Sequence, residues 1–309
     1  MTSVEAKWIA VTAVAPVAWG ANYVVTRQLL PADAPLWGSA LRALPAGLVL
    51  LAIARTLPRG AWWWRSAVLG TMNVGAFFLL VYVAAQLLPS SVAASVMALA
   101  PLAMAGFGWL LLGERPTPLL LGGSLAGIAG VLLLVGGASG AIDPAGVAAS
   151  AAALTLSCGG AVLTKRWSDE TTPLLAMTSW QLVAGGGVLT IAAVLVEGAP
   201  PALDARSAGG FAFTSLVATA IAYLCWFAGL ARLRAATVGV VGLLNPVTGV
   251  LLGALVANER FTLAQVAGIA LALAGILTAS RSGTKRIPVQ SEPDLLPSPS
   301  DDAPALAAA

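Results

Sequence analysis

Aromatic and amide side chains recur at helical spacing inside apolar stretches of this chain. One stripe contains Trp19, Asn22 and Tyr23, at positions i, i+3 and i+4, and a second contains Tyr223 and Trp226. Aromatic faces stack on flat or apolar groups, while amides and hydroxyls donate and accept hydrogen bonds. These residue types would bind a small neutral or zwitterionic molecule. The alternative is that the same side chains only pack helices against one another.

Further candidates extend this chemistry to other parts of the chain. A third run carries Asn73, Phe77 and Tyr82, and Asn245 stands directly before a proline. Met97 would form an adaptable wall, because methionine repacks around unlike ligands. The full set of substrate-site candidates is Trp19, Asn22, Tyr23, Asn73, Phe77, Tyr82, Met97, Tyr223, Trp226 and Asn245.

The residue types that enzymes and ATP-driven pumps need are missing. The chain has no histidine and no G-x-x-x-x-G-K-[ST] phosphate loop, and Cys158 and Cys225 lie inside apolar stretches as expected free thiols. No Asp, Glu or Lys stands in the middle of an apolar stretch, where a cation exporter would be expected to carry one. We therefore expect no cofactor, no metal site and no enzymatic activity. Arg42 is expected to snorkel to the membrane surface or to pair with a loop carbonyl.

Composition places the chain in a membrane. Apolar residues make up 59% of it, charged residues 9%, and the mean hydropathy is +0.90. A helix of about 20 apolar residues crosses a hydrocarbon core. Charged, Pro-rich and Gly-rich breaks separate ten such segments, which begin near residues 8, 36, 66, 91, 119, 146, 174, 209, 236 and 263.

The chain is also duplicated. At an offset of 145 residues Pro101 falls on Pro246 and Glu114 on Glu259, and glycines coincide at three further positions. An offset of 139 places Arg42 on Gln181. Because each half contains five segments, an odd number, the second half must enter the membrane with reversed polarity. The prolines are expected to act as kinks or hinges, and Glu114 and Glu259 as helix caps and loop partners at opposite membrane surfaces.

Basic residues indicate the orientation. With the N-terminus cytoplasmic, twelve of the 16 Lys and Arg residues fall on the inner side, and only Arg27, Arg206 and Arg260 fall outside. Single basic residues at helix ends carry topology information and do not form a nucleic-acid surface, so no nucleic-acid partner is expected. Small residues in the fifth segment indicate close helix packing, which fits a monomer or a weak dimer.

These features together resemble a known family. LRALPAGLVLL (41–51), LAPLAMAGFGWLLLGERPT (99–117) and LNPVTGVLLGALVANERFT (244–262) are similar to ten-helix EamA-type exporters of the drug/metabolite transporter superfamily. That resemblance implies that helices 1, 3, 4, 6, 8 and 9 line a central cavity. It also implies export of amino acids and other small metabolites across the bacterial inner membrane, with the aromatic amino-acid exporters as the subfamily most similar in aspect.

We therefore expect an all-α membrane protein of ten transmembrane helices in two inverted five-helix repeats. The repeats are expected over residues 1–140 and 141–281, followed by a disordered cytoplasmic tail over 282–309. The expected function is export of amino acids by alternating access through the lipid bilayer. The alternatives are a drug-efflux transporter of the same superfamily and, from another class, a polytopic membrane enzyme or a structural scaffold.

Overall fold

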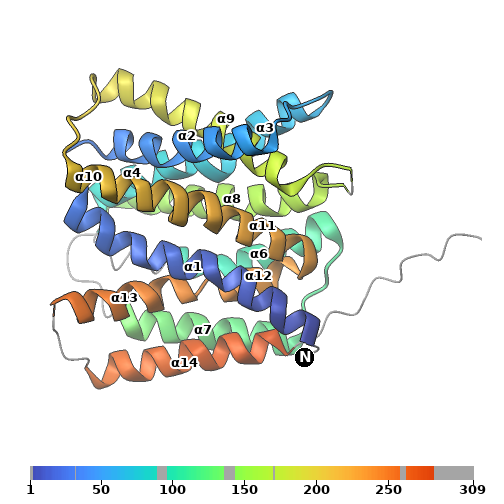
Figure 1. Ribbon diagram of the computed structural model, residues 1–309. Helices are drawn as coiled ribbons and strands as arrows, with labels where there is room; N and C mark the ends of the chain where they lie inside the picture. Colours follow the sequence, from blue (N-terminus) through green and yellow to red (C-terminus); the bar gives the residue numbers. More distant parts are fainter. Residues whose placement is uncertain are drawn as a thin grey trace, which may run out of the picture.

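The computed structural model describes residues 3–31, 33–88, 96–135, 143–169, 171–257 and 262–281. Within these ranges the chain is helical, with no strand. Figure 1 shows the helices lying roughly alongside one another as a single bundle. The expected all-α fold is confirmed.

Most of the ten expected segments are single helices. These are α1 (Ser3–Leu29), α2 (Pro35–Ala54), α7 (Pro118–Val135), α8 (Pro144–Trp167), α9 (Leu174–Val196) and α14 (Leu263–Ser280). The fourth segment has a turn at Ala98–Leu99 and continues as α6 (Ala100–Leu112). Three further segments are interrupted. They are α3 (Trp62–Gly70), η1 (Thr71–Gly75) and α4 (Ala76–Leu87); α10 (Ala205–Ala212), η2 (Phe213–Ile221) and α11 (Ala222–Arg232); and α12 (Ala235–Val241) with α13 (Leu244–Ala257).

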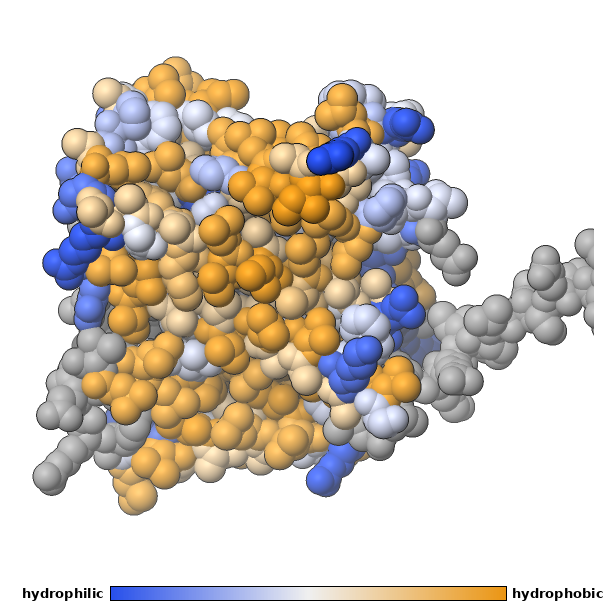
Figure 2. All heavy atoms as spheres, viewed as in Figure 1, coloured by the Kyte–Doolittle hydropathy of each residue, from blue (hydrophilic) through white to orange (hydrophobic). Residues whose placement is uncertain are grey.

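The outer face of the bundle is suited to lipid. Seven helical stretches of the described chain are long and apolar enough to cross a membrane, and shorter apolar helices supplement them. Large apolar side chains such as Leu110 and Leu195 are 77% and 79% exposed. Figure 2 shows an apolar band across the middle of one face, with hydrophilic residues towards its two ends. Apolar surface of this extent marks a membrane-embedded protein.

The helices of the two halves pair with their counterparts. The second helix of each half, α2 and α9, pack together, as do the fifth helices, α7 and α14. Glycines permit this approach, because a Cβ on Gly186 would lie 2.7 Å from the Leu44 nitrogen and one on Gly123 would lie 2.6 Å from the Ala279 nitrogen. In the described residues, helices of one half therefore pack directly against helices of the other half.

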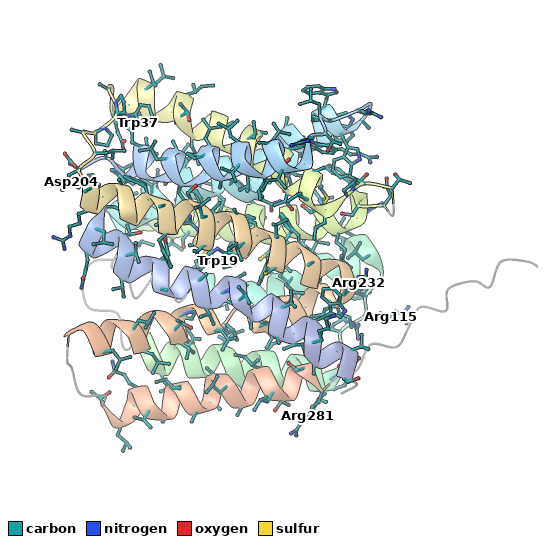
Figure 3. The ribbon with its side chains drawn as sticks, in the orientation of Figure 1. Trp19, Trp37, Arg115, Asp204, Arg232 and Arg281 are labelled. Carbon is teal, nitrogen blue, oxygen red and sulfur yellow. The ribbon has the colours of Figure 1, made fainter. Side chains whose placement is uncertain are left out.

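The last helices also show the inversion. α7 begins just after Arg115, and α14 ends just before Arg281. Figure 3 places both arginines at the same end of the bundle. One helix therefore begins at the end of the bundle where the other finishes. Since α7 and α14 also pack together, they are an antiparallel pair, as an inverted repeat requires.

Interruptions fall at matching places in the two halves. The third segment of each half contains a π-helical stretch, η1 or η2, and the fourth contains a turn, at Ala98–Leu99 or at Gly242–Leu243. The prolines were expected to bend continuous helices. Instead Pro101 stands in the first turn of α6, after the break, where its missing N–H leaves no hydrogen bond unmade. Single π-helical turns often mark functional sites.

Candidate functional site

An aromatic cluster links the two halves in the interior of the bundle. The ring centroid of Trp19 on α1 lies 5.7 Å from that of Tyr223 and 5.2 Å from that of Trp226, both on α11. Phe227 continues the cluster, 5.7 Å from Tyr223. The two stripes expected on the first and eighth segments therefore meet. The rings meet in the tilted and edge-to-face arrangements that aromatic pairs prefer.

The buried polar atoms around this cluster are connected across four helices. The Tyr223 hydroxyl donates to the Asn73 carbonyl in η1 at 3.0 Å. The Asn73 amide donates to the Gln181 Oε1 at 2.8 Å and to the Thr164 hydroxyl at 3.1 Å. Gln181 is 1% exposed, and its Nε2 has no hydrogen-bond partner. A buried amide with an unused donor is suited to a ligand oxygen or a bound water.

Arg42 was expected to snorkel to the membrane surface or to pair with a loop carbonyl, and the structure shows it bonded to the helical segment η2 instead. Its Nε donates to the Thr219 hydroxyl at 2.7 Å and its Nη2 to the Ala218 carbonyl at 3.0 Å, both in η2. Its guanidinium also stands over the Phe78 ring, 4.8 Å from the centroid. The Ala218 carbonyl also accepts the Trp19 Nε1–H at 3.0 Å. A cation and an aromatic wall of the cluster therefore share one acceptor.

The corresponding positions Arg42 and Gln181 play corresponding roles. Each reaches from the second helix of its own half to the π-helical stretch of the other half, Arg42 to η2 and Gln181 to η1. The alignment of the two residues was visible in the sequence. Their contacts with the π-helical stretches were not visible in the sequence, because nothing in the sequence marked those stretches.

The remaining candidates lie at different distances from the cluster. Tyr82 and Met97 pack against the buried core that contains Tyr223, and Phe77 contacts Phe78 at 5.4 Å. Asn22 and Asn245 each have a buried Oδ1 without a hydrogen-bond partner. The Tyr23 side chain, Glu259 and residues 282–309 lie outside what the structure describes.

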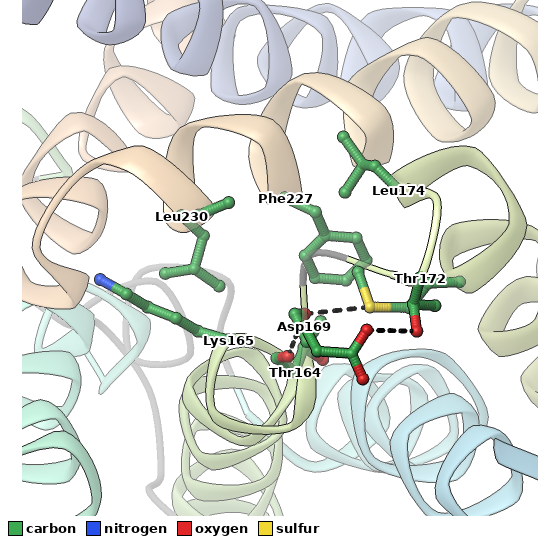
Figure 4. Close-up of a pocket in the computed structure, with 10 residues that line it drawn as sticks. Thr164, Lys165, Asp169, Thr172, Leu174, Phe227 and Leu230 are labelled. Atoms are coloured by element: carbon green, nitrogen blue, oxygen red, sulfur yellow. Dashed lines mark hydrogen bonds between the residues drawn. The ribbon is translucent and has the colours of Figure 1, made fainter. Parts of the chain in front are cut away.

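A pocket leads towards the polar network from one end of the bundle. It has an empty volume of about 400 Å³, part of it open to solvent, and its walls include Thr164, Lys165, Met177, Phe227 and Leu230. Figure 4 shows Phe227 and Leu230 above Thr164 and Lys165. Since Thr164 bonds to Asn73 and Phe227 contacts Tyr223, the pocket abuts both the network and the aromatic cluster.

A charged contact holds the two halves together beside this pocket. Lys165 Nζ lies 2.6 Å from the Glu114 Oε1 and donates to the Leu233 carbonyl at 2.5 Å. The second carboxylate oxygen, Oε2, accepts the Ala235 N–H at 2.8 Å, which caps α12. Glu114 was expected to be a helix cap, and it caps a helix of the other half.

A second carboxylate does the same at the opposite end and was missed in the sequence. Glu197 follows α9, and its two oxygens accept the N–H groups of Leu36 and Trp37 at 2.8 and 2.9 Å. It therefore caps α2, which belongs to the other half. No group of metal-ligating residues occurs in the described part of the chain.

Comparison with known proteins identifies the family. The sequence profile of the EamA-like transporter family matches this chain twice, over residues 6–136 and 145–281. The chain belongs to the EamA-like transporter family. It is a multi-pass membrane transporter of the drug/metabolite transporter superfamily with the ten-helix fold of that family.

Individual relatives agree with this assignment. Protein PecM of Dickeya dadantii (strain 3937) is 35% identical over 264 residues, which cover 85% of the transporter and 89% of PecM. The uncharacterized transporter YdeK of Bacillus subtilis (strain 168) is 33% identical over 201 residues, covering 62% of the transporter and 67% of YdeK. A crystal structure of a protein of 22% sequence identity superposes with a TM-score of 0.76, covering 88% of the transporter and 97% of that chain, and shows the same fold.

Proposed function

We propose that the transporter exports amino acids, aromatic ones among them, and related zwitterionic metabolites across the bacterial inner membrane. The observation that carries the proposal is the aromatic cluster of Trp19, Tyr223 and Trp226 with Arg42 bound to the same Ala218 carbonyl as Trp19. Indole and phenol rings suit an apolar or aromatic side chain, and the guanidinium favours a carboxylate over a cation.

The charge of Arg42 distinguishes this proposal from efflux of organic cations. A cationic drug would approach a fixed positive charge beside the aromatic rings, and like charges in a low-dielectric interior repel strongly. A zwitterion presents a carboxylate to the same group. The cluster therefore favours amino acids over the drug-efflux alternative.

The proposed orientation places the basic end of the bundle in the cytoplasm. Arg115, Arg232 and Arg281 lie at one end of the bundle, and Trp37 and Asp204 lie at the other (Figure 3). Under the positive-inside rule the first end is cytoplasmic, which puts both ends of the chain inside. The pocket beside Lys165 then opens towards the cytoplasm. Alternating access would open and close the Glu114–Lys165 contact between the halves, with no cofactor required.

The test is uptake of radiolabelled phenylalanine, tryptophan and threonine into liposomes that contain the purified transporter, with a quaternary ammonium dye in parallel. Because each aromatic contact is worth about 0.5–1.5 kcal/mol, Trp19→Ala and Trp226→Ala should each lower phenylalanine flux about 2- to 10-fold. Trp109→Ala is the matched control, since Trp109 is 60% exposed on the outer surface.

The results of these flux measurements decide between amino-acid export, drug efflux and a purely structural role for the cluster. Flux of amino acids that falls in the cluster variants and persists in Trp109→Ala supports the proposal. Arg42→Gln should reduce the preference for amino acids over the dye. Transport of the dye alone, or equal losses in Trp109→Ala and Trp19→Ala, would overturn it in favour of drug efflux or of a purely structural role for the cluster.

A further inference from the structure

An arginine enclosed by tryptophans lies at the basic end of the bundle, away from the aromatic cluster. The Arg65 guanidinium in the first turn of α3 lies 5.7 Å from the Trp62 ring centroid and 5.8 Å from those of Trp64 and Trp167. Its Nε is buried and has no hydrogen-bond partner. Within the described residues no carboxylate lies within ion-pair distance of Arg65. Such a donor on a cation points to an anion that completes the site.

The tryptophan cage is held in place by contacts with the second half. Trp64 packs edge-to-face on Trp167 with centroids 5.0 Å apart, and Trp62 lies 5.6 Å from Trp180. Trp180 in turn donates to the Thr56 carbonyl at 2.8 Å, which fixes the loop before α3. The cage is therefore a preformed feature of the folded bundle.

The surroundings of the cage are both apolar and basic. Trp63 and Trp64 are 61% and 52% exposed, so indole rings face outward beside the guanidinium. Arg59 is exposed in the preceding loop, where its carbonyl accepts the Trp62 N–H at 3.0 Å, and Arg166 is exposed next to Trp167. Exposed indoles at a helix end are characteristic of the membrane–water interface, and basic side chains there attract anionic lipids.

We propose that Arg65 and its tryptophan cage bind the phosphate of an anionic phospholipid in the adjoining leaflet. The planar guanidinium donates to phosphate oxygens, which would satisfy the unpaired Nε, and Arg59 and Arg166 supply additional positive charge. The exposed Trp63 and Trp64 rings lie beside the glycerol and upper acyl chains. These apolar contacts favour a lipid over free phosphate, which has no acyl chains to cover the indoles.

The experiment is native mass spectrometry of the delipidated transporter, titrated with phosphatidylglycerol, phosphatidylcholine or inorganic phosphate. Wild-type protein should retain phosphatidylglycerol in preference to phosphatidylcholine. Because a direct charge-assisted hydrogen bond to the phosphate adds to the general attraction of basic residues, Arg65→Gln should lower the retained phosphatidylglycerol by about tenfold. Arg65→Lys keeps the charge and fold but not the planar fork, and should show an intermediate loss.

Arg281→Gln is the matched control, because it removes the same charge from the same end of the bundle (Figure 3). It should leave the lipid preference unchanged. Equal losses in Arg281→Gln and Arg65→Gln would show general charge attraction and overturn the proposal. So would equal retention of the two lipids by wild-type protein, or displacement of bound phosphatidylglycerol by inorganic phosphate. The measurement is independent of the transported substrate.

Discussion

Removing the Glu114 carboxylate should destabilise the contact between the halves by a predictable amount. Glu114 accepts one bond from Lys165 at 2.6 Å and one from the Ala235 N–H at 2.8 Å. The Lys165 and Glu114 side chains are 19% and 15% exposed, so water screens the pair only in part. An exposed pair contributes about 0–1 kcal/mol and breaking a buried pair costs about 3–5 kcal/mol. We therefore expect Glu114→Ala to lower the free energy of unfolding by about 2–3 kcal/mol.

Substitutions that remove one interaction at a time separate the ion pair from the cap. Glu114→Gln retains an oxygen that can accept the Ala235 N–H but loses the charge, so it should cost less than Glu114→Ala. Lys165→Met leaves the carboxylate without its cation. The double variant of Glu114→Gln and Lys165→Met should cost less than the sum of the single changes, with a coupling of about 1–2 kcal/mol.

The assay is reversible unfolding in mixed micelles, with the fraction of sodium dodecyl sulfate as denaturant and circular dichroism as readout. Thr155→Ala is a control, because Thr155 is exposed and its hydroxyl donates to the Ala151 carbonyl of its own helix at 2.8 Å. Additive effects of Glu114→Gln and Lys165→Met would refute the reasoning, since they would show that the two side chains do not stabilise each other.

Three further predictions concern other parts of the bundle. A Cβ on Gly160 would overlap the Asn73 Oδ1, so Gly160→Ala should lower the unfolding temperature and reduce transport, whereas Gly187→Ala, with nothing within 4 Å, should change neither. Glu197→Gln should destabilise the start of α2, and its first N–H groups should then exchange hydrogen faster. Exchange at the wild-type rate in Glu197→Gln would contradict the assigned cap. The Ser207 hydroxyl and backbone N–H lower the pKa of Asp204 from 3.8, so the cap of α10 is complete above that pH and is lost as the pH falls through the lowered pKa. Hydrogen exchange in α10 should rise below about pH 3.8 in wild-type protein and already be raised at neutral pH in Asp204→Ala.

Helical periodicity was enough to anticipate which aromatic residues face the interior. Trp19, Tyr223 and Trp226 follow the i, i+3 and i+4 rule on their own helices, and the resemblance to the EamA-type exporters placed those helices at one cavity. The duplication also identified α7 and α14 as equivalent helices with shared glycines, but their packing against each other was seen only in the structure. These features depend on local spacing or on internal similarity, both of which can be read along the chain.

Contacts that depend on distant or irregular backbone could not be read in the same way. Arg42 was expected near the surface because its depth along α2 was visible but its acceptors in η2 were not. Glu197 gave no signal, since the N–H groups that it caps are 160 and 161 positions away. A π-helical stretch has no distinct sequence period, so the acceptors that η1 and η2 present became visible only in three dimensions.

The pairing of matching helices also sets the order in which the protein can be completed during synthesis. The α2 cap joins residues 160 positions apart, so at about 5–20 residues per second α2 would wait ~8–32 seconds for its partner to be made. Until then the glycine-lined faces of α2 and α7 are inside the membrane without α9 and α14. The insertion machinery or neighbouring lipids must cover these faces in the interval. A chain that stops between the halves would lack α9 and α14, the packing partners of α2 and α7.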